Sequence, residues 1–207
     1  MQQCSVAEAQ VGDQNGGVSS SAWPNLYGTR GMLLVATPPL DDPNFDRSVI
    51  YMMEHTAEGA VGLVLNRPTE EDVIDGLDRW MELSAPPAVV FDGGPVQLDA
   101  LIALAEVTHP QEDAWSPILP DLGSVDLARD PVDVAEDIGR VRVFRGYAGW
   151  APGQLDSELA AGAWMVFDAQ RDDVFNEAPD ELWRDVLRRQ RGRVAWLANA
   201  PDDLSMN

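Results

Sequence analysis

Three short apolar segments, residues 31–37, 48–54 and 60–65, follow one another and are separated by turn segments at residues 38–47 and 55–59. Each is a continuous apolar run bounded by turn-forming residues, the pattern of a buried strand. Asp42-Pro43-Asn44 forms the centre of the first turn, and residues 55–59 make the second. The spacing predicts an antiparallel hairpin of the second and third strands, with the first strand nearby.

Beyond residue 66, helical and strand patterns are mixed. Residues 140–147 alternate apolar residues with arginines, as expected of a half-buried strand, and residues 98–107 predict a strand although their alanine content also permits a helix. Strands that run first in consecutive pairs and then mix with short helices predict an α+β fold with a mainly antiparallel or mixed sheet. The further predicted elements are strands at 88–91 and 163–168, helices at 69–83, 131–138, 152–161 and 179–190, and a loop at 109–123.

The chain of 207 residues is long enough for one domain with its own core. Residues 1–22 are rich in Gln, Ser, Gly and Asn and hold few large apolar groups, so they are predicted to be a disordered tail. Residues 23–207 are predicted to form a single folded domain.

Charge limits the classes of partner. Acidic residues outnumber basic residues by 35 to 14, all fourteen bases are arginine, and the net charge is −21. Nucleic-acid binding is driven by neutralising phosphates, so we expect no direct binding to DNA. Anionic membrane surfaces are disfavoured in the same way, and no apolar run is long enough to span a bilayer. Residues 1–10 lack the features of a signal peptide, so a cytoplasmic location is expected.

Five of the fourteen arginines lie in residues 184–193. One interpretation is an anion-binding patch. The other is that they complement the dipole of the predicted helix 179–190 and pair locally with acids. We favour the second interpretation.

The usual catalytic and cofactor-binding patterns are missing. One cysteine and two histidines cannot build a Cys/His zinc site, and we predict no metal. The sequence contains no G-x-x-x-x-G-K-[ST], G-x-G-x-x-G or G-x-S-x-G pattern, so we predict no nucleotide cofactor and no hydrolase nucleophile. His55 is expected to be a hydrogen-bonded structural residue. These observations favour a protein that is not an enzyme and assign no catalytic residues.

Three segments place glycine, proline and polar residues beside strand ends, namely 65–68, 92–96 and 146–159. Such segments either shape turns or let a backbone approach a ligand closely, and both interpretations stay open for the third, where a glycine loop precedes a predicted helix. Together they give the candidate ligand- or partner-binding residues Asn66, Arg67, Gly93, Gly94, Pro95, Gly146, Tyr147, Gly149, Trp150, Gln154 and Glu158.

The same segments carry a resemblance to a known family. GMLLVATPPLDDPNFDRSVIYMMEH, EGAVGLVLNRP, the GGPV turn and GYAGWxPGQLxxEL occur in the order found in the YqgE/AlgH family, over about residues 27–207, with Asp156 where the family usually has glutamate. The resemblance implies an α+β fold with a bifurcated mixed sheet bent into a pseudo-barrel. It implies a regulatory role, because one branch is linked genetically to alginate biosynthesis, although the family has no established molecular activity. The family's shared positions are Asn66, Arg67, Pro68, Gly93, Gly94, Pro95, Gly146, Tyr147, Gly149, Trp150, Gly153 and Gln154.

Three functional hypotheses follow. The first is a regulatory protein that acts through a protein partner or a bound small molecule. The second is a small-molecule-binding protein or enzyme whose pocket is formed by the three segments, which requires them to meet in space. The third, a DNA-binding transcription factor, is disfavoured by the charge of −21.

Overall fold

The computed structural model describes residues 28–38, 40, 42–70, 76–108, 115–119 and 121–200. The predicted tail, residues 1–22, lies outside them. The strands are β1 (Met32–Ala36), β2 (Val49–Thr56), β3 (Gly59–Val64), β4 (Phe91–Asp92), β5 (Val96–Val107), β6 (Trp115–Leu119), β7 (Leu122–Val125), β8 (Ile138–Trp150) and β9 (Trp164–Asp168). The α-helices are α1 (Asp78–Met81), α2 (Gln154–Ala160), α3 (Arg171–Val174), α4 (Leu182–Arg188) and α5 (Arg193–Leu197), and the 3₁₀ turns are η1 (Pro131–Asp133) and η2 (Pro179–Glu181).

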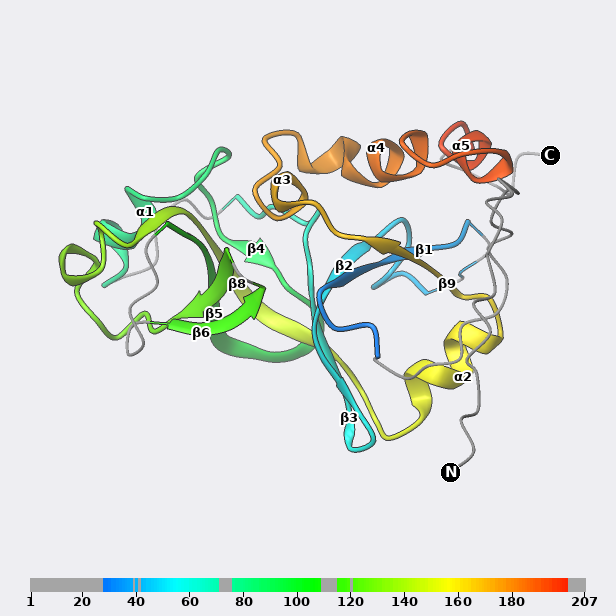
Figure 1. Cartoon of the computed structure of the whole chain (residues 1–207), viewed down its shortest axis with the longest axis horizontal. Coiled ribbons are helices and arrows are strands. Elements are labelled where there is room, and N and C mark those ends of the chain that lie inside the picture. Colours follow the sequence, from blue (N-terminus) through cyan, green and yellow to red (C-terminus); the bar gives the residue numbers. More distant parts are fainter. Residues whose placement is uncertain are drawn as a thin grey trace, which may run out of the picture.

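One mixed, open sheet organises the molecule. Its strand order is β6-β7-β5-β8-β3-β2-β1-β9, with antiparallel pairing throughout, and the short β4 pairs in parallel with β8. Strand β8 belongs to both halves of the sheet, because β5 pairs along it as far as Tyr147 and β3 pairs with residues 148–150. Figure 1 shows β8 crossing from one half to the other. The predicted α+β fold with a divided, mainly antiparallel sheet is confirmed, and the sheet is not closed.

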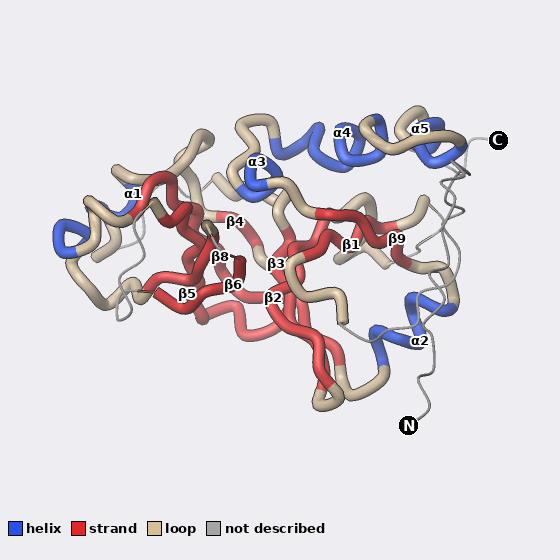
Figure 2. Tube along the Cα trace, viewed as in Figure 1, coloured by secondary structure: helices blue, strands red, loops and turns tan. Residues whose placement is uncertain are grey.

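The first strands are apolar over most of their length because both of their faces are covered there. In β1, Leu33 and Val35 join a core with helix α4, whereas Leu34 and Ala36 join a second core with helix α2. Successive side chains of a strand point to opposite faces, so a strand buried on both sides shows a continuous apolar run rather than alternation. Figure 2 shows the helices at the periphery, with α4 and α5 along one side of the strands and α2 on the other.

A third core fills the other half of the sheet. Trp80 and Met81 of α1 pack there against Ala103 and Ala105 of β5 and Val141 of β8. Figure 1 shows that α1 lies in this half, far from α4 and α5. The strand predicted at 98–107 is confirmed, and it begins two residues earlier, at Val96.

The predicted helix at 69–83 is wrong in its first residues. Only α1, residues 78–81, is helical, and residues 71–75 lie outside the described part of the chain. The backbone N–H and the hydroxyl of Thr69 both donate to the Val90 carbonyl, at 2.9 and 2.8 Å. Thr69 therefore joins its segment to the one that holds Val90 by hydrogen bonds, and it does not cap a helix.

The predicted loop at 109–123 is also partly wrong, because it contains β6 and the start of β7. β6 ends the strand order, and proline is tolerated on an edge strand, so Pro117 does not exclude a strand there. The predicted helix at 131–138 is only the short turn η1 before β8. Helices α3 and α5 were not predicted.

Candidate functional site

The first predicted segment follows β3 and fixes the start of β2. The Asn66 side-chain oxygen accepts from the Val49 N–H at 2.9 Å, and its nitrogen donates to the Arg47 carbonyl at 2.9 Å. Asn66 is 8% exposed, so its amide replaces backbone partners inside the protein. Arg67 is different, because its guanidinium donates to the Asp46 carbonyl and lies at the surface.

The second and third segments cross with almost no space between their backbones. The Gly93 N–H donates to the Arg145 carbonyl at 2.8 Å, and its carbonyl accepts from the Val64 N–H at 2.9 Å. A Cβ on Gly94 would overlap the backbone nitrogen of Ala148, and one on Gly146 would lie 2.5 Å from the Gly94 carbonyl oxygen. These glycines are required because the three segments meet where the sheet divides.

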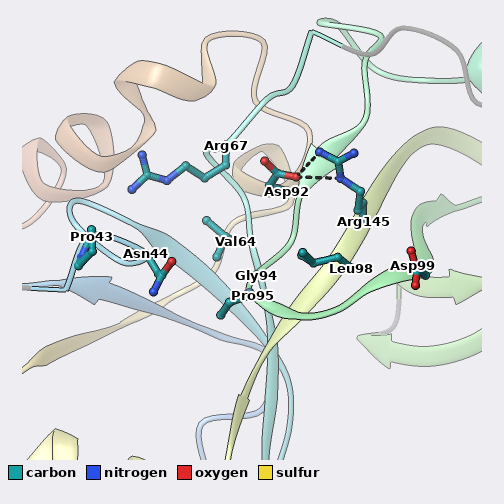
Figure 3. Close-up of a pocket in the computed structure, with 10 residues that line it drawn as sticks. All are labelled: Pro43, Asn44, Val64, Arg67, Asp92, Gly94, Pro95, Leu98, Asp99 and Arg145. Atoms are coloured by element: carbon teal, nitrogen blue, oxygen red, sulfur yellow. Dashed lines mark hydrogen bonds and ion pairs between the residues drawn. The ribbon is translucent and has the colours of Figure 1, made fainter.

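A groove of about 760 Å³ opens beside this crossing. Figure 3 shows Arg67, Asp92 and Arg145 in a row, with Val64, Pro95 and Leu98 below them in the view. In this row the Arg145 guanidinium pairs with the Asp92 carboxylate at 3.0 Å, and the Arg67 side chain extends away from that pair. The groove is lined by Pro43, Asn44, Val64, Arg67, Asp92, Gly94, Pro95, Leu98, Asp99 and Arg145.

The second half of the third segment, which holds Trp150, Gln154 and Glu158, does not line the groove. The Glu158 carboxylate accepts from the indole N–H groups of Trp150 and Trp164, at 2.9 and 2.8 Å, and from the Gln154 amide at 2.9 Å. The Phe45 ring packs against both indoles. Charge-assisted bonds from two buried indoles make this cluster a structural joint between β8, α2 and β9.

The eleven candidate residues therefore divide into separate groups. Arg67, Gly94 and Pro95 line the groove, while Gly93 and Gly146 form the crossing beneath it. Asn66 is buried beside Arg67. Gly149 packs against the Tyr147 ring, and Tyr147 itself packs against the main core. Trp150, Gln154 and Glu158 belong to the indole cluster and not to the groove.

His55 joins the beginning of the described chain to α2. Its Nδ1 accepts from the Thr29 backbone N–H at 3.3 Å and lies 3.1 Å from the Thr29 hydroxyl. Its Nε2 lies 3.6 Å from an Asp156 carboxylate oxygen. Both ring nitrogens face structural partners, which agrees with the structural role predicted for this histidine.

The arginines of residues 184–193 are paired mainly with acids, as we favoured. Arg188 pairs with Asp185 at 2.9 Å and with Glu181 at 3.7 Å, and Arg189 pairs with the buried Asp173 at 2.6 Å. Arg184 lies 3.9 Å from Glu181. It also lines a second cavity of about 160 Å³, together with Asp46, Arg47, Asn66, Arg67, Asp180 and Trp183.

Arg142 is not on a solvated face, contrary to the alternation predicted for residues 140–147. It is 1% exposed and donates to the carbonyls of Pro86 and Asn176, at 2.7 and 3.0 Å. Its guanidinium lies over the Phe91 ring, 4.2 Å from the centroid. Burial, assisted by the nearby charge of Arg140, lowers the pKa of Arg142 to about 10. The buried guanidinium of Arg142 thus links the segments that hold Pro86 and Asn176 to β8.

Other groove residues were missed. Asn44, Leu98, Asp99 and Arg145 line the groove, but nothing in their local pattern distinguishes them from ordinary turn or strand residues. A bend in β5 places Leu98 and Asp99 there, because the pairing of β5 with β8 is interrupted between Val96 and Leu101.

Two further observations bear on the class of protein. In the described part of the chain, no group of three or more His, Cys, Asp or Glu residues is placed to hold a metal ion. None of the helices there is long and apolar enough to cross a membrane.

The fold and the groove define a single-domain α+β protein with a candidate binding site where its sheet divides. The chain belongs to the AlgH-like family, whose profile matches residues 33–195. It is 47% identical over 182 residues to a UPF0301 protein of Streptomyces avermitilis, covering 86% of this chain and 94% of that protein. The resemblance noted in the sequence is thereby confirmed.

Two solved structures share the fold. The crystal structure of protein DIP2367 from Corynebacterium diphtheriae superposes with a TM-score of 0.79 at 28% identity, covering 84% of this chain and 93% of that one. The solution structure of AlgH from Pseudomonas aeruginosa gives a TM-score of 0.60 at 29% identity, covering 89% of this chain and 100% of that one. Neither likeness assigns a molecular activity.

Proposed function

We propose that this protein is a cytoplasmic regulatory protein that binds a small molecule in the groove beside the glycine crossing. The proposal rests mainly on the environment of Arg67. Its guanidinium lines the groove and donates to a backbone carbonyl, and no described carboxylate forms an ion pair with it. An arginine that is oriented but not neutralised is suited to an anionic group on a ligand.

The shape of the groove supports the proposal. Its volume of about 760 Å³ falls within the roughly 300–1,000 Å³ typical of small-molecule sites. Pro95 and Leu98 supply an exposed apolar surface near the charged side chains, and the glycine crossing is rigid because backbone hydrogen bonds join its segments. A preformed groove of this kind needs little rearrangement on binding.

Direct DNA binding is not part of the proposal. The chain carries a net charge of −21, and each cavity brings carboxylates together with its arginines. Duplex DNA would be repelled at long range by this net charge.

Thermal unfolding of the purified protein with a panel of anionic metabolites tests the proposal. A ligand at 100 times its dissociation constant adds roughly 2.7 kcal/mol of stability, which raises the unfolding midpoint by several degrees. The shift should disappear in Arg67→Gln and persist in Arg191→Gln, which removes the same charge at an exposed position of the helical region. Equal shifts in the two variants would count against the groove.

A second candidate function is docking of a protein partner at the mouth of the groove. Leu98 and Leu101 are 56% and 37% exposed on the same strand, which is unusual for large apolar side chains. Cross-linking in native extract tests this alternative. A partner lost in a Leu98→Ser, Leu101→Ser double variant but retained in Val132→Ser, another exposed apolar position, would favour it.

A further inference from the structure

We infer that the ligand of the groove is a zwitterion whose anionic end contacts Arg67 and whose cationic end, beyond an apolar spacer, contacts Asp99. This inference rests on the proposed function and adds the chemical class of the ligand. The charged side chains that line the groove are two arginines and two aspartates, namely Arg67, Arg145, Asp92 and Asp99.

The lining of the groove is formally neutral, and two of its four charged groups already pair with each other. The Arg145 guanidinium contacts the Asp92 carboxylate at 3.0 Å. Among the described residues, none forms an ion pair with Arg67, and none forms a hydrogen bond or ion pair with the Asp99 side chain. One cation and one anion therefore remain for a ligand. A purely anionic ligand would meet Asp99 as a like charge, whereas a zwitterion complements both groups.

The two remaining charged groups lie apart, so the charged ends of the ligand must also be separated. In Figure 3, Arg67 and Asp99 lie on opposite sides of the Asp92–Arg145 pair. Leu98 lies between them in this view and is 56% exposed. An apolar spacer over Leu98 would remove this surface from water. A chain of methylene groups with one charge at each end fits this arrangement better than an α-amino acid, whose two charged groups share one carbon atom.

The backbone of β5 is distorted where Leu98 and Asp99 reach the groove. Successive side chains of a regular strand point to opposite faces, yet these two neighbours line the same groove. The pairing of β5 with β8 is interrupted between Val96 and Leu101, and Gln97 in this stretch has a φ of +49°. This left-handed conformation is unfavourable for a residue with a side chain, and such strain is typical of binding sites. The strain supports a binding role for this stretch of β5.

The test is a ¹H–¹⁵N NMR titration of the full-length protein at constant ionic strength with three ω-amino acids: 4-aminobutanoate, 6-aminohexanoate and 8-aminooctanoate. Each is compared with the hydroxy acid of the same length, in which a neutral hydroxyl replaces the ammonium group. For at least one length, the wild type should bind the amino acid about threefold more tightly than the hydroxy acid. A preference of this size lies within the range measured for exposed ion pairs.

Replacing Asp99 separates a specific contact from the general attraction of cations to an acidic protein. Asp99→Asn should abolish the preference for the amino acid without weakening the binding of the hydroxy acid. Asp133→Asn removes the same charge from an exposed residue outside the groove and should keep the preference. Arg67→Gln should weaken the binding of both probes about threefold or more, because both carry the carboxylate.

Four outcomes would overturn the inference: no probe binds, amino and hydroxy acids bind equally at every length, Asp99→Asn keeps the preference, or Asp133→Asn loses it. Failure of the proposed function would look different. If the hydroxy acid binds through Arg67 and the ammonium group adds nothing, the groove is an anion-binding site and only the zwitterion is wrong. If no probe binds, the thermal shifts with the metabolite panel still decide the proposed function. Equal binding of a probe by the wild type and Arg67→Gln would count against both.

Discussion

The indole N–H of Trp150 donates to the Glu158 carboxylate at 2.9 Å, across the turn that joins β8 to α2. The other indole on the same carboxylate, that of Trp164, comes from β9. The Glu158 side chain thus joins α2 to β8 and β9. These contacts explain the second half of the GYAGWxPGQLxxEL motif in structural terms.

Replacing Glu158 tests this joint. Both indoles donate to one carboxylate oxygen and Gln154 donates to the other, so Glu158→Gln removes the charge and places an N–H₂ group against the Gln154 amide. We expect a loss of about 2 kcal/mol in the free energy of unfolding. Urea denaturation followed by tryptophan fluorescence measures it. Glu177→Gln, at an exposed position, is the control and should change stability by less than about 0.5 kcal/mol. Equal stability of the two variants would contradict the structural role.

The glycine crossing predicts that position 94 tolerates no side chain. Gly94→Ala combines a backbone φ of +147° with overlap against backbone atoms of Tyr147 and Ala148, which cannot move aside. We expect a loss of at least about 3 kcal/mol. Gly162→Ala is the matched control, because Gly162 has a φ of +77° but open space around it, and should lose only about 1 kcal/mol. Similar losses in circular-dichroism melts would contradict the close crossing.

We expect Glu106 to make a pH-dependent contribution to the free energy of unfolding. Burial would raise the pKa of Glu106, but hydrogen bonds from Arg140 at 3.0 Å and Arg171 at 2.7 Å outweigh burial and hold this pKa below its usual value of 4.5. A carboxyl with a lowered folded-state pKa stabilises the protein above the unfolded-state pKa and loses that contribution as pH falls through the folded-state pKa.

Urea denaturation between pH 7 and pH 3 measures this contribution. The wild type should lose more stability below about pH 4.5 than Glu106→Gln, because the variant has no carboxylate to protonate at this site. Parallel pH profiles for the two proteins would show that Glu106 does not contribute in this way.

Because Arg142 is buried, we expect its removal to lower the free energy of unfolding substantially. Arg142→Met keeps much of the volume but leaves the carbonyls of Pro86 and Asn176 without their donor, and we expect a loss of about 3 kcal/mol. Arg142→Lys should not restore stability, since an ammonium lacks the planar fork that donates to both carbonyls while lying over Phe91. Full rescue by lysine, measured by thermal melts, would contradict the role of the guanidinium geometry.

The sequence predicts β1 and β3 well because each is short and mostly buried. The apolar runs 31–37 and 60–65 correspond to β1 and β3 within one or two residues. Prediction failed where tertiary contacts override local preference. Thr69 resembles a helix cap but bonds to Val90, and Arg142 alternates like a surface residue but lies in the core.

The candidate site was predicted in part for a similar reason. The sequence singles out Arg67, Gly94 and Pro95 because glycine and proline beside strand ends are conspicuous. Asn44 and Leu98 reach the same groove only because a distant turn and a bend in β5 converge there. Such convergence depends on the whole fold, and local sequence carries no signal of it.

We propose above that the groove binds a small molecule through Arg67. Equilibrium dialysis of the purified protein against a cell metabolite extract, with mass spectrometry of the retained compounds, tests it most directly. We expect at least one metabolite to be enriched by the wild type and by Arg191→Gln but not by Arg67→Gln. Enrichment of nothing, or the same enrichment by all three proteins, would contradict it.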